Sequence, residues 1–304
     1  MRISVSLRTS YPADSGSEAA GWILEQTGAA RDAGLDALYL GDHHSTGPSA
    51  AYFQNVALLG RLLAEWDDRP VGGLFLLPLW NPVLLAEQVG TLASMHGGRF
   101  ILQTAIGDGV TQFAGMGVAR VGRTKRFEAG FDIVRRLLAG EVVTDETGLF
   151  RIEGACIAPV PEVPVEYWIG ATARAGIDRA ARLADGWECN AHVVPREAEG
   201  QAAAYRGACA DLGRDPGVVA IRRDVHVASD ARIAAAFADR AVAAGYRGFR
   251  PDALIFGSVE SVATQFRRYA DMGYDEIIVR HFCDDQPAVL SSLQLLGDVR
   301  AALR

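Results

Sequence analysis

A carboxylate and two imidazoles stand together at Asp42-His43-His44, directly after the apolar stretch 38–40 and Gly41. Histidine is the side chain whose ordinary pKa lies closest to neutrality, so it suits proton transfer. In parallel α/β folds, ligands bind where the strands end at their carboxyl termini. The pattern therefore favours a catalytic site. A surface turn, or a helix start capped by Asp42 with solvated histidines, is the alternative interpretation.

Residues 170–174, Gly-Ala-Thr-Ala-Arg, form a second candidate site at an expected strand-to-helix junction. Backbone N–H groups at a helix start, the hydroxyl of Thr172 and the cation of Arg174 could together bind a phosphate. An ordinary helix cap at Thr172 with a solvated Arg174 explains the same residues. The local sequence leaves both interpretations open.

Strands and helices are expected to alternate along the whole chain. The apolar patterns predict strands at 2–7, 36–40, 71–77, 99–104, 165–169, 186–190, 218–228 and 276–280. They predict helices at 17–34 (with Ser17 as N-cap), 52–65, 82–95, 123–139, 172–184, 197–212, 230–244, 258–272 and 287–303. A glycine-interrupted loop is expected at 105–117, a small hairpin near 141–152, and an irregular segment at 246–256.

Eight such units in 304 residues favour a single (β/α)₈ TIM barrel spanning residues 1–304. An open doubly wound sheet is the alternative. The first strand is not followed by the GxGxxG fingerprint of dinucleotide-binding folds, which argues against that alternative.

Composition excludes several classes of function. The formal net charge of −7 argues against nucleic acid or an anionic membrane as a main partner. The apolar runs are too short to span a bilayer, and the amino terminus lacks the apolar region of a signal peptide. Four scattered cysteines form neither a disulfide scaffold nor a zinc signature. We therefore expect a cytoplasmic protein with free thiols and no metal site.

The strand ends predicted by the barrel are rich in apolar and small residues and poor in carboxylates. A glycosidase needs two facing carboxylates, and a metal hydrolase needs a cluster of ligands. An apolar mouth with histidines instead suits a planar cofactor that carries its own chemistry. The residues expected to face a substrate are Tyr11, Tyr52, Trp80, Trp187, His281 and Phe282.

Four segments resemble the bacterial luciferase-like flavin and deazaflavin oxidoreductases. Residues 33–43 resemble the family's "aGfD…DH" signature, and residues 76–100 resemble its "LP…hP…AE…tLd…GRf" run. Residues 168–187 resemble its "wiGG…arlaDGw" segment, and residues 257–275 resemble its "GtpeeV…aGvde" ending. The four segments occur in the family's order and cover essentially the whole chain.

The resemblance implies a luciferase-like (β/α)₈ barrel, usually dimeric, that holds reduced FMN or coenzyme F420. It implies that His43 handles protons or assists hydride transfer, and that Thr172 meets the cofactor phosphate. Luciferase has an arginine for the phosphate where this chain has Ile106, so either Arg174 supplies that charge or the phosphate is held less tightly. The predicted cofactor-binding residues are Leu77, Thr104, Ala105, Ile106, Gly107, Gly170, Ala171, Thr172, Ala173 and Arg174.

The resulting prediction is a monooxygenase that uses reduced FMN from a partner flavin reductase, with O₂, on a small apolar or aromatic substrate. His43 is its main catalytic residue, Asp42 orients it, and His44 is secondary. A homodimer is expected. One alternative is an F420-dependent hydride-transfer enzyme, and another is a non-catalytic barrel subunit of a heterodimer.

Overall fold

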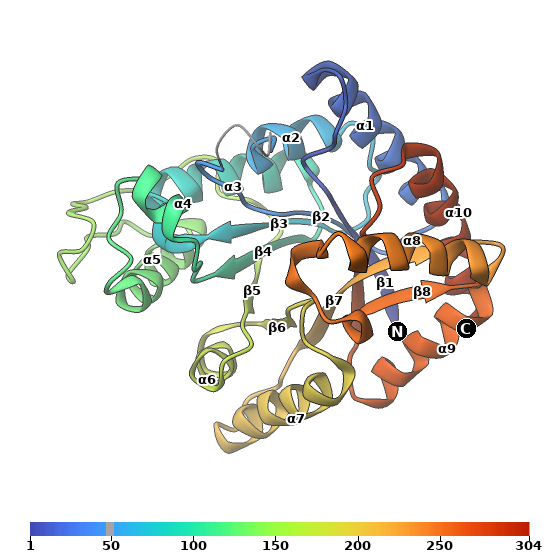
Figure 1. Cartoon of the computed structure of the whole chain (residues 1–304). Helices are drawn as coiled ribbons and strands as arrows, with labels where there is room; N and C mark the ends of the chain where they lie inside the picture. Colours follow the sequence, from blue (N-terminus) through green and yellow to red (C-terminus); the bar gives the residue numbers. More distant parts are fainter. Residues whose placement is uncertain (47–51, 304) are drawn as a thin grey trace. The chain divides into compact units, whose positions relative to one another are not determined.

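The structure, a computed structural model, describes residues 1–46 and 52–303, and in this part of the chain strands and helices alternate (Figure 1). The strands are β1 (Arg2–Leu7), β2 (Leu38–Leu40), β3 (Val71–Leu76), β4 (Phe100–Ala105), β5 (Glu166–Gly170), β6 (Gly186–Cys189), β7 (Val218–Val227), β8 (Leu254–Gly257) and β9 (Glu276–His281). The α-helices are α1 (Gly16–Asp32), α2 (Asn55–Leu62), α3 (Pro82–His96), α4 (Val110–Gly115), α5 (Arg123–Leu138), α6 (Arg174–Leu183), α7 (Pro195–Asp211), α8 (Ala231–Ala243), α9 (Val259–Asp271) and α10 (Gln286–Ala302). Short 3₁₀ turns are η1 (Leu77–Leu79), η2 (Tyr246–Gly248) and η3 (Pro251–Ala253).

The chain divides into two compact units. The first unit comprises Met1–Tyr39 and Trp168–Arg304, and the second comprises Leu40–Tyr167. In the first unit β5, β6 and β7 pair in parallel, and β9 pairs in parallel with both β7 and β1. In the second unit β3 and β4 pair in parallel from Val71↔Phe100 onward. Parallel pairing with intervening helices is the architecture predicted, and the (β/α)₈ TIM-barrel class is confirmed.

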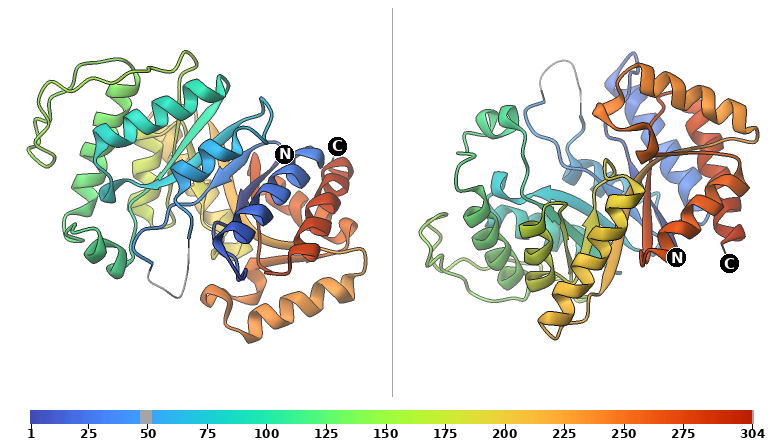
Figure 2. Two further views of the ribbon diagram at one scale, coloured as in Figure 1. Left: turned by 90° about the horizontal axis from the view of Figure 1, so that it is seen from above. Right: turned by 60° about the horizontal axis from the view of Figure 1, so that its bottom comes forward.

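Buried apolar strands and helices make the core of the first unit. Helices α1 and α10 come from opposite ends of the sequence and lie side by side (Figures 1 and 2). Helix α10 also packs on α9 and on β7. The strands bury residues on both faces, since β9 is buried throughout its length. Such strands read as continuous apolar runs, which is why the sequence located them well.

Local signals in the second unit set the boundaries of α3. The side chain of Asn81 accepts hydrogen bonds from the backbone N–H groups of Val83 (2.9 Å) and Leu84 (3.2 Å). Pro82 occupies the first turn, where its missing N–H costs nothing. Gly97 ends the helix with φ of 69°, a left-handed conformation that favours glycine. These residues turn the chain from β3 back toward β4.

Four details differ from the expectations. Ser15, rather than Ser17, caps α1 by accepting a hydrogen bond from Glu18 N–H. Helix α4 lies within the expected glycine loop, and β8 lies within the segment expected to be irregular. The excursion near 141–152 holds one antiparallel bridge, Val143↔Ala155, in place of a regular hairpin. Short elements carry too few residues to show a period in sequence.

Two further observations concern the described residues as a whole. None of their helices is both long and apolar enough to cross a membrane. Cys189, Cys209 and Cys283 are buried, Cys156 is exposed, and all four are free thiols. The thiols therefore match the expectation from their spacing.

Candidate functional site

Asp42 is the centre of a buried polar network in the second unit. Its side chain is 2% exposed and lies just beyond β2. One carboxylate oxygen, Oδ2, accepts hydrogen bonds from the backbone N–H of Leu76 and from the indole Nε1–H of Trp80, each at 2.8 Å. The other oxygen, Oδ1, lies 3.0 Å from His44 Nε2. Asp42 is therefore fixed by groups from β3 and from the turn that follows it.

The two histidines that follow Asp42 point to different neighbours. The ring of His44 is buried and meets Trp80 edge-on, with ring centroids 5.4 Å apart. The ring of His43 is partly exposed and stacks on Tyr52, with centroids 3.9 Å apart. The structure thus brings together five residues that the sequence singled out: Asp42, His43, His44, Tyr52 and Trp80. His44, rather than His43, is the histidine paired with Asp42. This corrects the expectation that Asp42 orients His43.

The cofactor-binding residues predicted in the second unit lie at the ends of β3 and β4. Leu77 and Thr104 are fully buried, whereas Ala105, Ile106 and Gly107 are partly exposed. Gly107 has φ of 68°, and an added Cβ would lie 3.4 Å from the ring of Phe113. The backbone there is both left-handed and closely packed, so it presents peptide groups rather than side chains.

The predicted phosphate-binding turn of the first unit leads from β5 into α6. Ala173 is the N-cap of α6, and its methyl side chain cannot accept a hydrogen bond from the first turn. The uncapped N–H groups can therefore bind an anion. Arg174 is exposed and pairs with Asp178 at 2.8 Å on its own helix. Its cation points along α6, so the prediction that Arg174 supplies the phosphate charge gains no support.

Two residues expected to face a substrate lie on the other face of their strands. Trp187 is fully buried and stacks on Tyr205 of α7, with ring centroids 5.3 Å apart. His281 is buried, and its Nε2 lies 2.9 Å from Ser292 Oγ of α10. Burial lowers the pKa of His281 to about 3, so its ring is neutral at physiological pH. Both side chains pack against helices, which corrects their assignment as substrate contacts.

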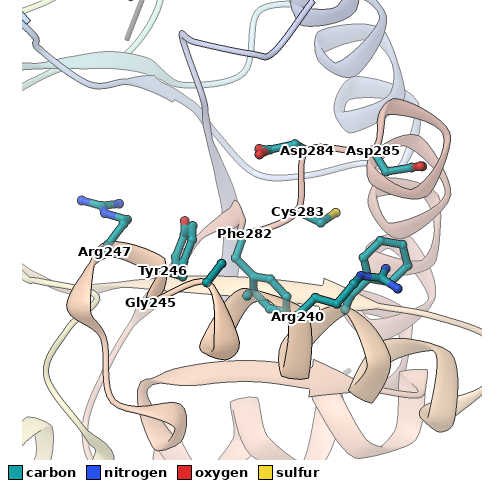
Figure 3. Close-up of a pocket in the computed structure, with 11 residues that line it drawn as sticks. Arg240, Gly245, Tyr246, Arg247, Phe282, Cys283, Asp284 and Asp285 are labelled. Carbon is teal, nitrogen blue, oxygen red and sulfur yellow. The ribbon is translucent and has the colours of Figure 1, made fainter. Parts of the chain in front are cut away.

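A cavity of about 550 Å³ lies in the first unit beside Phe282, which was predicted to face a substrate (Figure 3). Its other lining residues come from α8, η2 and the loop after β9: Phe237, Arg240, Ala241, Ala244, Gly245, Tyr246, Arg247, Cys283, Asp284 and Asp285. Tyr11 was also predicted to face a substrate. It is buried, and its hydroxyl donates a hydrogen bond to Gln26 Oε1 at 2.6 Å. The lining mixes aromatic rings with charges of both signs.

Sequence reasoning missed a charged cluster in the same unit. Asp224 of β7 is fully buried, and its Oδ2 accepts a hydrogen bond from the hydroxyl of Tyr246 at 2.8 Å. Arg222 and Arg247 lie 3.3 Å and 3.4 Å from its carboxylate oxygens. Arg280 of β9 is the register partner of Asp224. Charged residues inside a buried parallel strand were the available signal, because such positions are normally apolar.

Glu188 of β6 adds a titratable group to this cluster. Burial raises its pKa to about 7, an effect opposed by the positive charge of Arg222 and reinforced by the negative charge of Glu276. Glu276 is itself compensated, because it accepts hydrogen bonds from Arg2 and from the hydroxyl of Tyr39. Glu188 can therefore exchange a proton near neutral pH, a property suited to acid–base chemistry.

Comparison with known proteins identifies one family. A family model described as luciferase-like monooxygenase matches residues 1–277. An F420-dependent glucose-6-phosphate dehydrogenase of Nakamurella multipartita is 29% identical over 177 residues. That match covers 55% of this chain and 51% of the relative, so the chain spans about half the length of this relative.

Two solved structures share the fold over nearly the whole chain. The monooxygenase RslO1 from Streptomyces bottropensis superposes with a TM-score of 0.84 at 17% identity, covering 99% of both chains. An F420-dependent secondary alcohol dehydrogenase, solved with an F420–acetone adduct, gives a TM-score of 0.82 at 17% identity and covers 100% of this chain and 99% of that one. These likenesses concern the fold.

Proposed function

Because the chain belongs to the luciferase-like monooxygenase family, we propose that it is an oxidoreductase that transfers a hydride between coenzyme F420 and a small polar substrate. The observation that carries the proposal is the fixed Asp42 network, which presents two histidines at the end of β2. The similarity to an F420-dependent dehydrogenase supports the choice of cofactor. The charged cluster around Asp224 supports a polar substrate over the apolar one expected from sequence.

The first unit offers groups that fit the phosphate of such a cofactor. The uncapped first turn of α6 offers N–H groups to a phosphate, with the hydroxyl of Thr172 beside it. The left-handed Gly107 lets the chain end β4 without a side chain. When bound, F420 supplies or accepts the hydride.

Each residue near Asp42 has one role in this proposal. Asp42 holds His44 in place and compensates its charge when the ring is protonated. His43 would exchange a proton with a substrate oxygen, because the residue follows Asp42 at the end of β2 and is partly exposed. Trp80 shields the carboxylate of Asp42 and keeps its geometry fixed.

A second candidate is the monooxygenase that uses reduced FMN from a flavin reductase. The aromatic surroundings of Asp42 and His44 favour it, since Phe75 and His44 both contact Trp80 edge-on. Aromatic walls of this kind exclude water from a reactive site. The likeness to RslO1 supports the same reading. Homodimer formation is part of both proposals.

The test is a titration of the purified protein, without oxygen, with reduced F420 and separately with reduced FMN, followed by admission of air. Tight F420 binding with oxygen-independent oxidation of the cofactor by carbonyl substrates would support hydride transfer. Preference for FMN with oxygen consumption would transfer support to the monooxygenase. Binding of neither cofactor would overturn both and leave the non-catalytic subunit.

A further inference from the structure

The charges around Asp224 do not balance. Three guanidinium groups, those of Arg222, Arg247 and Arg280, surround one buried carboxylate. Glu188 offsets this excess only in part, because burial raises the pKa of its carboxyl to about 7 and so disfavours the charged form. The cluster therefore carries an excess positive charge within the first unit.

Some N–H groups of Arg222 and Arg280 lack hydrogen-bond partners among the described residues. Arg280 is 6% exposed, and its Nε has no partner among the described residues. The Nη2 of Arg222 is buried and likewise has no hydrogen-bond partner among those residues, whereas its Nε lies 3.3 Å from Asp224 Oδ1. Burial and the positive charges of Arg222 and Arg247 lower the pKa of Arg280 to about 10. A buried cation without partners is costly unless an anion completes it.

The cluster adjoins open space. Tyr246 and Arg247 line the cavity of about 550 Å³, and the same two residues contact Asp224 with their polar ends. In Figure 3 Tyr246 lies between Arg247 and Phe282. An organic molecule in this cavity would thus have aromatic rings around its body and Arg247 beside it, and Arg247 connects the cavity wall to Asp224 and the arginines behind it.

We infer that Arg222, Arg247 and Arg280 bind an oxyanion, a carboxylate or phosphoryl group, carried by the substrate. This inference rests on the proposed function and names its substrate class: small anionic organic molecules. Guanidinium groups match carboxylate and phosphoryl oxygens because their N–H donors form a planar fork. Tyr246 donates a hydrogen bond to Asp224, whose carboxylate pairs with both Arg222 and Arg247.

Two variants and a matched control test the site. Arg280→Met removes the buried cation and keeps most of the side-chain volume. Arg247→Gln removes a cation that is 39% exposed, so folding is not at risk. Arg240→Met is the control, because Arg240 lines the same cavity but packs over Phe237, 4.4 Å from the ring centroid.

The measurement is the thermal unfolding midpoint against potassium phosphate and against potassium benzoate, with potassium chloride at equal ionic strength as reference. The wild-type midpoint should rise saturably with either oxyanion. Arg280→Met and Arg247→Gln should weaken the fitted affinity by about tenfold to a hundredfold, the value of a charge-assisted hydrogen bond. Arg240→Met should stay within about threefold of wild type, since it leaves all three arginines of the cluster in place.

Stability without added oxyanion separates a binding role from a structural one. If Arg280 serves to bind a ligand, Arg280→Met without oxyanion should have the same thermal unfolding midpoint as wild type or a higher one, because the variant no longer buries that charge. A marked loss of stability would make Arg280 a structural partner of Asp224 and overturn the inference. An equal response to phosphate in Arg280→Met and wild type would overturn it as well.

A cofactor phosphate is the other source of an oxyanion. Titrations of wild type and Arg280→Met with FMN and riboflavin, and with F420 and its phosphate-free deazaflavin chromophore, separate the two sources. Equal cofactor affinities in both proteins support the substrate assignment, and weaker binding of only the phosphorylated cofactors in Arg280→Met overturns it. Failure of wild type to bind any cofactor would defeat the proposed function while the phosphate and benzoate responses still decide the anion site.

Discussion

Asp42 and Asp224 are both buried carboxylates near strand ends, yet their surroundings differ. Asp42, in the second unit, accepts two hydrogen bonds at 2.8 Å on one oxygen and pairs with one histidine on the other. Asp224, in the first unit, accepts one hydrogen bond of 2.8 Å and has arginines at 3.3 Å and 3.4 Å. In the first network one carboxylate faces two N–H donors and one histidine, and in the second one carboxylate faces more cations than it can neutralise.

The difference indicates two kinds of task. A buried carboxylate held by hydrogen bonds and an ion pair from the protein keeps its neighbours in one geometry. That arrangement suits residues that take part in proton transfer. An unbalanced network is costly until a ligand completes it, which suits recognition of a charged molecule.

The largest effect should come from His43→Ala, which removes the partly exposed histidine of the second unit. Turnover should fall by about 10²–10⁴, the usual contribution of general acid–base catalysis. His96→Ala is the control, because His96 lies at the end of α3. Steady-state kinetics with the cofactor identified by titration measures both. Turnover within about threefold of wild type would remove His43 from the mechanism.

Asp42→Ala should lower the free energy of unfolding by about 3–5 kcal/mol, because it leaves two buried N–H donors and His44 without their acceptor. Urea denaturation measures the change. Asp67→Ala, which removes an exposed pair with Arg69, should cost less than about 1 kcal/mol. A similar small loss in both variants would show that the Asp42 network does not hold the second unit together.

Glu188→Gln should change how stability depends on pH. Burial raises the folded pKa of Glu188 to about 7 from an ordinary value of 4.5, so the folded protein binds the proton more tightly than the unfolded chain. Wild-type stability should therefore fall as pH rises from about 4.5 to 7, by at most about 3 kcal/mol. The variant, which has no charge to bury, should lack this component of the decrease. Unfolding curves at several pH values measure the change. The prediction is contradicted if the free energies of unfolding of the two proteins change with pH in the same way.

Tyr246→Phe should produce the smallest effect, a loss of about 1–2 kcal/mol in the free energy of unfolding, since Asp224 loses its shortest hydrogen bond. The matched control is Tyr205→Phe, whose hydroxyl donates to the carbonyl of Pro216 at 2.8 Å rather than to a carboxylate. The control should lose less, because a hydrogen bond to a charged group contributes more. Equal losses would mean that the charge of Asp224 is already screened.

Local signals in the sequence predicted much of the fold. The cap at Asn81, the proline after it and Gly97 act within one helix, so their effect can be read without the rest of the chain. The cluster in the first unit could not be read this way. Asp224 and Arg280 are far apart in sequence and meet only through the pairing of β7 with β9.

The two corrected substrate contacts share one physical cause. Successive residues of a strand point to opposite faces, so a choice that is off by one residue reverses the side chain's surroundings. Trp187 and His281 pack on helices, while their neighbours Glu188 and Arg280 belong to the charged cluster. The sequence located the strand ends, but composition alone did not fix which face each residue occupies.

Strand β8 pairs with the last residues of β7, Asp224 to Val227, while β9 pairs with β7 from Ala220 to Val225. The segment from α8 to β8 is thus an appendage to a complete strand pairing, and it carries Tyr246 and Arg247. Insertions or replacements there leave the β7–β9 register unchanged. We therefore expect ligand preference to change through substitutions in this segment. Such substitutions, in relatives or in engineered chimaeras, would leave the Asp42 network as it is.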